Sequence, residues 1–159
     1  MHRRLLITLP LLSFASRPVA AQPSQDQFRP TEYTAILPEH RLVADFESLT
    51  DGSQIYIPPT FRYRLTLRTS GVVQEVAEPR RKALDGWAVT FRAQDFVQRF
   101  THEVEVAAGN QTFWLPWQQA LLKPFNDEMR SGGSFSVKVL FAGAIKGQLL
   151  LLAIGYHQL

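Results

Sequence analysis

The chain has 159 residues, no cysteine, and 17 Lys and Arg residues against 14 Asp and Glu residues. Without cysteine there can be no disulfide, so stability must come from the burial of apolar side chains, for which the chain offers 11 Phe and 3 Trp. Three of the basic residues lie within the first 21 positions, so the remaining chain carries 14 positive and 14 negative groups. This balance gives no general attraction for nucleic acid, which we therefore do not expect as a partner.

The first 21 residues have the order of a secretory signal peptide. His2-Arg3-Arg4 is a short basic start, Leu5–Ala15 is an apolar run, and Val19-Ala20-Ala21 supplies the small residues of a cleavage site. The run is too short for a membrane-spanning helix, which needs about 20 apolar residues. We predict cleavage between Ala21 and Gln22, a periplasmic or secreted mature chain, and no transmembrane segment in that chain.

The segment after the leader is polar and rich in proline. Residues 22–38 predict an extended or disordered arm, with a short edge strand over Tyr33–Leu37 as the alternative. Residues 39–159 are expected to form a single domain. Its first strands are predicted from alternation at Leu42–Glu47 and from the short run Gln54–Ile57.

The middle of the chain predicts three strands. Phe61–Arg68 is the clearest, because its apolar residues fall on one face and its polar residues on the other. Ser70-Gly71 predicts a hairpin turn into a second strand, Val72–Ala77. A loop over Glu78–Asp85 carries the basic trio Arg80-Arg81-Lys82, and the alternation of Gly86–Ala93 predicts the third strand.

The last third of the chain predicts further strands and one helix. Pro116–Leu122 is the predicted helix, because proline suits a first helical position and Lys123-Pro124 would end it. The apolar run Gln148–Tyr156 predicts a central strand covered on both faces. The other predicted strands are Phe100–Ala107, Gln111–Leu115 and Phe135–Ala142.

Strands of this length, separated by frequent turn signals, predict an all-β fold. We expect an antiparallel β-sandwich, jelly-roll or immunoglobulin-like, with one short helix, and a closed barrel as the alternative.

A row of arginines is the first candidate binding feature. Arg62, Arg64 and Arg68 share one face of the predicted strand Phe61–Arg68, and guanidinium groups bind carboxylate or phosphate groups well. The alternative is a solvated sheet face on which these arginines pair with Glu75, Glu103 or Glu105.

The aromatic segment Phe113–Trp117 is the second candidate. Trp114 would point away from Phe113 and Leu115 on a strand, and an exposed tryptophan can stack on a sugar ring or anchor a protein partner. The alternative is that Trp114 or Trp117 packs beneath the short helix as part of the core.

No motif for catalysis, metal binding or cofactor binding is found in the sequence. His40, His102 and His157 have no ligand spacing, although copper binding by them is worth testing. Glu103 and Glu105 share a strand face but have no accompanying hydrolase motif. We therefore assign no catalytic residue, no metal ligand and no cofactor.

These observations favour a non-enzymatic function. We expect an exported accessory or binding module of the cell envelope that engages another envelope or secreted protein, for example by strand addition. One alternative is a carbohydrate-binding module that uses Arg62, Arg64, Arg68, Trp114 and Trp117 to bind a polysaccharide. The other is a small hydrolase or metal-binding protein.

Overall fold

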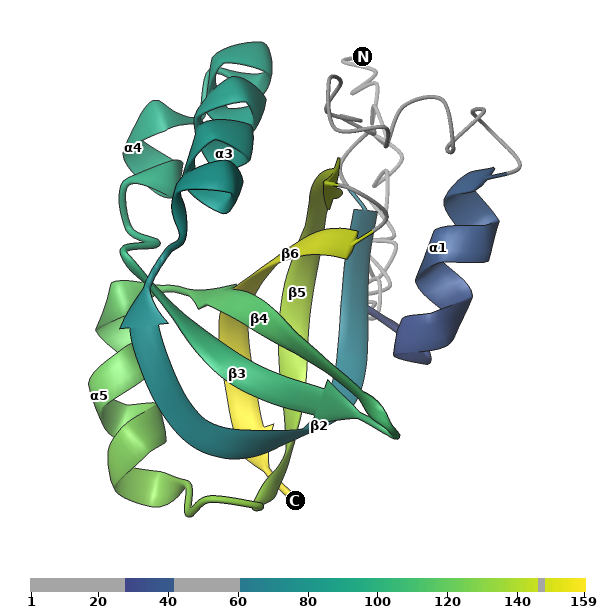
Figure 1. The fold of residues 1–159 in the computed structure, drawn as a ribbon, viewed down its shortest axis with the longest axis vertical. Helices are drawn as coiled ribbons and strands as arrows, with labels where there is room; N and C mark the ends of the chain where they lie inside the picture. The colour runs from purple at the N-terminus through teal and green to yellow at the C-terminus, as the bar shows by residue number, and fades with distance from the viewer. Residues whose placement is uncertain (1–27, 42–60, 146–147) are drawn as a thin grey trace, which may run out of the picture.

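The structure, a computed structural model, describes residues 28–41, 61–145 and 148–159. The predicted signal peptide, most of the predicted arm and the predicted strands Leu42–Glu47 and Gln54–Ile57 lie outside these residues. The elements follow in chain order (Figure 1): β1 (Arg29–Pro30), α1 (Tyr33–Arg41), β2 (Phe61–Glu75), α3 (Glu78–Phe91), α4 (Gln94–Val97), β3 (His102–Ala108), β4 (Gln111–Trp117), α5 (Gln119–Glu128), β5 (Ser134–Ile145) and β6 (Gln148–Gln158).

Five of the strands form a closed mixed barrel in the order β2–β3–β4–β6–β5, with β5 pairing back to β2. Neighbouring strands are antiparallel except β4 and β6, which are parallel and paired at Trp117 and Ala153. The short strand β1 pairs with β2 in parallel. This arrangement resembles the OB-fold, a five-stranded Greek-key barrel. Along the chain, helices α3 and α4 connect the first and second barrel strands, β2 and β3, and α5 connects the third and fourth, β4 and β5.

Strand β2 changes partner halfway along its length. Its first half, Phe61–Arg68, pairs with β5, and its second half, Arg68–Glu75, pairs with β3. The pairing with β3 is irregular between Thr69 and Val73, and Gly71 has a φ of +82° within this stretch. The predicted hairpin turn at Ser70-Gly71 is therefore wrong, because glycine here bends one continuous strand around the barrel (Figure 1).

The interior of the barrel is filled by the inward-facing side chains of all five strands. Ile36 of α1, Phe125 of α5 and Met129, which directly follows α5, join this core from two sides of the barrel (Figure 1). The buried strand residues of the core are Tyr63, Leu65, Leu67, Val104, Val106, Leu115, Trp117, Phe135, Val137, Val139, Phe141, Leu149, Leu151 and Ala153.

A second core lies outside the barrel, beneath α3 and α4. Leu84, Trp87 and Val97 of these helices pack on the outward faces of β5 and β6, which contribute Leu140, Ala142, Leu150 and Leu152. Residues Leu149–Ala153 of β6 are thus buried on both faces, which confirms the prediction made from their apolar run.

The fold differs from the predicted all-β sandwich. The described residues form a barrel, the alternative that the sequence left open, accompanied by the helices α1, α3, α4 and α5. Helix α3 replaces the predicted loop Glu78–Asp85 and the predicted strand Gly86–Ala93. The buried residues of α3 recur with helical spacing: Ala83, Leu84, Trp87 and Ala88. Val89 and Phe91, which suggested a strand, are exposed.

The other two predictions of local structure also need correction. Tyr33–Arg41 form helix α1, where the sequence predicted an arm or a short strand. The helix predicted at Pro116–Leu122 is displaced to Gln119–Glu128, with Pro124 inside it, because Pro116 and Trp117 continue β4 into the barrel core. Within the described residues, no helix has both the length and the apolar character needed to cross a membrane.

Candidate ligand-binding cleft

The three arginines of the predicted stripe lie on the outer face of β2. Arg62, Arg64 and Arg68 stand opposite Leu140, Lys138 and Ser134 of β5, respectively. The guanidinium carbon of Arg62 lies 5.9 Å from the ring centroid of Phe28, and Arg68 donates a hydrogen bond of 3.4 Å to the carbonyl of Gly109.

Trp117 is fully buried, so it is not the exposed ligand-binding residue that the sequence suggested. Its indole packs against Phe125 of α5, with ring centroids 4.4 Å apart, and also contacts Phe135 and Tyr156. The alternative interpretation, that one of the two tryptophans packs beneath the helix, is correct for Trp117.

Trp114 lies on the outer face of β4, partly exposed and directly opposite Glu105 of β3. Because β4 does not neighbour β2 in the barrel, Trp114 is separated from Arg62 and Arg64, which lie on the half of β2 that pairs with β5. The structure therefore does not combine the arginine stripe and the tryptophans into one site.

Trp114 instead lines a cleft on one side of the barrel. The cleft consists of two adjoining hollows, of about 190 and 390 Å³, which share Phe113, Gln148 and Leu149. We call the two together the Trp114 cleft. Its other lining residues are Pro79, Arg80, Trp114 and Ile145 in the first hollow, and Tyr33, Thr34, Pro38, Gln111 and Thr112 in the second.

Three aromatic residues, Tyr33, Phe113 and Trp114, line this cleft. Tyr33 of α1 stacks on Phe113 of β4, with ring centroids 4.1 Å apart and planes inclined by 14°. Burial raises the pKa of the Tyr33 phenol to about 12, so the phenol stays uncharged at physiological pH. The α1 helix thus adds an uncharged aromatic surface to the cleft.

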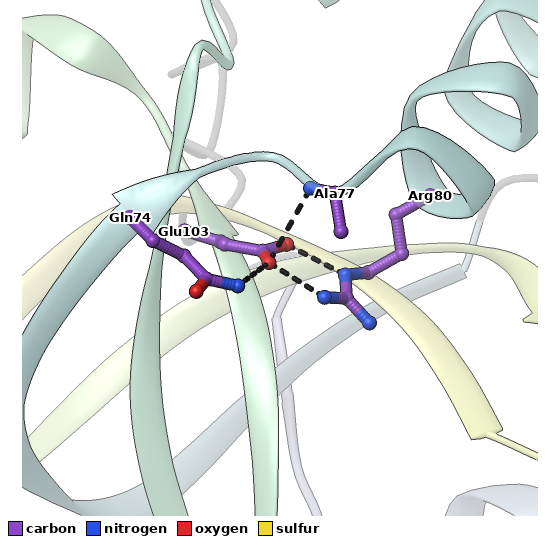
Figure 2. A network of polar contacts seen from close by, with 4 residues as sticks. All are labelled: Gln74, Ala77, Arg80 and Glu103. Atoms are coloured by element: carbon purple, nitrogen blue, oxygen red, sulfur yellow. Dashed lines mark hydrogen bonds and ion pairs between the residues drawn. The ribbon is translucent and has the colours of Figure 1, made fainter.

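A buried ion pair lies beside the first hollow, which Arg80 lines. Glu103 of β3 is fully buried, and its two carboxylate oxygens accept hydrogen bonds from Nε (2.6 Å) and Nη2 (2.5 Å) of Arg80 (Figure 2). Gln74 Nε2 donates a further bond of 2.6 Å, and the backbone N–H of Ala77 lies 3.4 Å away. This network ties the first turn of α3 to β2 and β3.

The sequence did not predict this pairing. It placed Arg80 in a basic loop and considered Glu103 as a partner for the arginine stripe. The signal that could have found it is Glu103 itself, because a glutamate on a sheet face that becomes buried requires a cation nearby.

The structure does not bring the candidate histidines and glutamates of the sequence together into a metal site among the residues that it describes. No group of three or more His, Asp or Glu side chains in this part of the chain could hold a metal ion. His102 contacts Thr101 Oγ1 through Nδ1 at 2.9 Å, whereas His157 lies exposed on β6 opposite Ser136, and the side chain of His40 lies outside the described set. Glu103 and Glu105 share a face, but Arg80 occupies both Glu103 oxygens.

The sequence matches no known protein family, and a search of curated proteins finds no relative. Function must therefore be argued from the cleft itself. Its described lining is aromatic and amide-rich, and Arg80 is its one charged member. Such a surface can bind a ligand that has both an apolar face and uncharged hydrogen-bonding groups.

Proposed function

We propose that the mature chain is an exported, non-catalytic binding module of the cell envelope that holds a saccharide in the Trp114 cleft. The observation that carries this proposal is the joint presence of a partly exposed Trp114, stacked aromatic rings and uncharged amides around one hollow. The cell-envelope location rests on the leader-like sequence of residues 1–21.

The chemistry of the lining suits a sugar ring. A pyranose has an apolar face of C–H groups, which packs on an aromatic ring, and an edge of hydroxyl groups, which need both donors and acceptors. Gln111, Thr112 and Gln148 supply both kinds of group beside Trp114 and Phe113. The combined hollows fall in the size range of small-molecule sites, about 300–1,000 Å³.

The position of the cleft in the fold also supports this function. OB-fold barrels bind oligonucleotides and oligosaccharides on the face of their second and third strands, between the loops that follow strands one and four. The Trp114 cleft lies between α3, which follows the first barrel strand, the third strand β4, and the adjacent ends of β5 and β6 at Ile145 and Gln148. This support is an analogy of fold. The balanced charge of the mature chain favours oligosaccharides over oligonucleotides.

A protein partner remains the second candidate. Among the described residues, β4 pairs with β6 only at Trp117 and Ala153, so most of the β4 edge beside the cleft has no strand partner there. An extended segment of another envelope protein could add to this edge, and its side chains would then meet Trp114.

Binding of the purified mature chain to an array of polysaccharides tests the proposal. We expect binding to at least one glycan, weakened about fivefold or more in Trp114→Ala, because a lost aromatic stack costs about 1 kcal/mol or more. Phe91→Ala is the matched control. Phe91 is exposed at the far end of α3, about 16 Å along the helix from Arg80, and its removal should leave binding unchanged.

Absence of binding to any glycan, or equal binding by Trp114→Ala, would overturn the saccharide proposal. A synthetic extended peptide that protects the backbone amides of β4 from hydrogen exchange would then favour strand addition instead.

A further inference from the structure

We infer that the Arg80–Glu103 pair sets the charge selectivity of the Trp114 cleft, so that the cleft takes uncharged saccharides and rejects acidic ones. This inference rests on the proposed function and concerns the same site. It assigns specificity to Arg80, which lines the cleft, and to Glu103, which is buried and acts on ligand binding through Arg80.

The charge of Arg80 is compensated within the protein. Two of its three guanidinium nitrogens, Nε and Nη2, donate to Glu103, and its side chain is 18% exposed while that of Glu103 is fully buried. The third nitrogen, Nη1, points away from the carboxylate (Figure 2). Because Arg80 lines the cleft, a ligand there meets a guanidinium group whose positive charge is compensated by Glu103.

An acidic sugar gains little from such a donor. A free guanidinium binds a carboxylate through two parallel N–H bonds, and the Nε–Nη2 edge is one of the edges that can do so. In this protein Glu103 already occupies that edge. A ligand carboxylate would then approach Nη1 while its charge is repelled by that of Glu103.

A second carboxylate opposes acidic ligands from the β3 side. Glu105 stands directly opposite Trp114 on the outer face of the sheet and is partly exposed. A ligand stacked on Trp114 therefore lies close to a negative charge. An uncharged hydroxyl group can accept a hydrogen bond from Arg80 Nη1 without this repulsion.

Gln74 and Ala77 hold the pair in place. Their bonds to Glu103 come from β2 and from the residue that precedes α3, so the carboxylate is fixed from three directions. Glu103 thereby acts as a positioning residue, because it orients Arg80 and sets the charge of the cleft without reaching the ligand.

The test uses pairs of glycans of equal linkage in which a carboxylate replaces the hydroxymethyl group: β-1,4-glucan with β-1,4-glucuronan, and β-1,4-mannan with β-1,4-polymannuronate. We expect the native chain to bind the neutral member of at least one pair about tenfold or more tightly than the acidic member. Glu103→Gln removes the negative charge and keeps the side-chain shape. We expect it to shift this ratio toward the acidic member by about tenfold or more, since Arg80 is then uncompensated.

A second variant and a measurement on the native chain guard against misfolding of Glu103→Gln. The double variant R80M/E103L replaces a buried ion pair by apolar residues of similar size, a change that proteins commonly tolerate. We expect it to narrow the preference for the neutral member, because the repulsion by Glu103 is gone while that by Glu105 remains, and to bind the neutral member about fivefold more weakly, because the Nη1 donor is lost. Neutral-glycan binding by the native chain should change less than about twofold between about 50 and 500 mM salt.

The outcomes separate the two proposals. If the native chain binds the acidic member as tightly as the neutral one, or if R80M/E103L binds the neutral member at full strength, the inference is overturned while saccharide binding stands. If no pair binds, or if Trp114→Ala has no effect, both proposals fail.

Discussion

Tyr33 and Phe113 stack face to face across the boundary between α1 and the barrel, with ring centroids 4.1 Å apart. Tyr33 precedes every barrel strand in the sequence, whereas Phe113 lies on the third of them. Together with the buried Ile36, this contact holds α1 against the barrel beside the Trp114 cleft. The N-terminal helix is therefore a structural part of the cleft.

Replacement of Tyr33 by alanine should loosen α1 and open the second hollow of the cleft. We expect Tyr33→Ala to lower the free energy of unfolding by about 1–3 kcal/mol, the range for a partly buried aromatic residue. Tyr33→Phe keeps the stack and should lie within about 0.5 kcal/mol of the native chain. Urea unfolding followed by circular dichroism measures both, and equal midpoints for the two variants would show that the stack contributes nothing.

The two tryptophans of β4 should respond to mutation in opposite ways. Trp117 is fully buried against Phe125, so Trp117→Ala should cost about 3–5 kcal/mol of unfolding free energy. Trp114→Ala removes a partly exposed ring and should cost about 1 kcal/mol or less. Chemical denaturation of the two purified variants compares them directly. A stable Trp117→Ala protein would contradict the position of Trp117 in the core.

Two glycines provide a contrast of backbone conformation. Gly71 has a φ of +82° at the bend of β2, so Gly71→Ala should destabilise the fold by about 1 kcal/mol or more. Gly86 lies inside α3, where an added Cβ would meet no other atom within 4 Å, so Gly86→Ala should stabilise the fold by about 0.5–1 kcal/mol. Thermal unfolding should move the two midpoints in opposite directions, and a shift of both in the same direction would contradict this assignment.

Alkaline pH should destabilise the fold through its tyrosines. Burial raises the pKa values of Tyr33, Tyr63 and Tyr156 to about 12, above the ordinary value of 10.0 that they regain on unfolding. The unfolded chain therefore releases these protons first, so stability is complete below pH 10 and is lost as the pH rises from 10 to 12.

Melting temperatures measured across this pH window check the effect, and phenolate absorbance of the folded chain should rise mainly near the upper end. Tyr33→Phe removes one of the three groups and should make the loss of stability less steep. A melting temperature that stays constant from pH 10 to 12 would contradict the burial of these phenols.

Alternation in the sequence predicted the strands that have one buried face. β3 and β4 begin and end close to the predicted segments Phe100–Ala107 and Gln111–Leu115, and the two-sided burial of Leu149–Ala153 follows from their apolar run. The alternation also placed Trp114 on the outer face. Each of these features depends only on the neighbouring residues along the chain.

The missed features depend on contacts between distant segments. Trp87, Val89 and Phe91 alternate as in a strand, yet α3 forms because Leu84 and Trp87 pack on the outside of β5 and β6. β4 and β6 pair in parallel at Trp117 and Ala153. These residues are far apart along the chain, so their pairing produces no pattern in the local sequence. The Arg80–Glu103 pair likewise joins an inserted helix to a strand, so neither the cleft nor its charge could be predicted from the sequence.

The change of partner along β2 has a consequence for the order of folding. Phe61–Arg68 must wait for β5, which is synthesised almost last, whereas β3 with β4 and β5 with β6 can pair as local hairpins. Pairing over so long a sequence separation slows folding, because the entropy of loop closure is lost before the contacts form. We therefore expect closure of the barrel to be a late step in folding, because the first half of β2 pairs with β5, the fourth barrel strand.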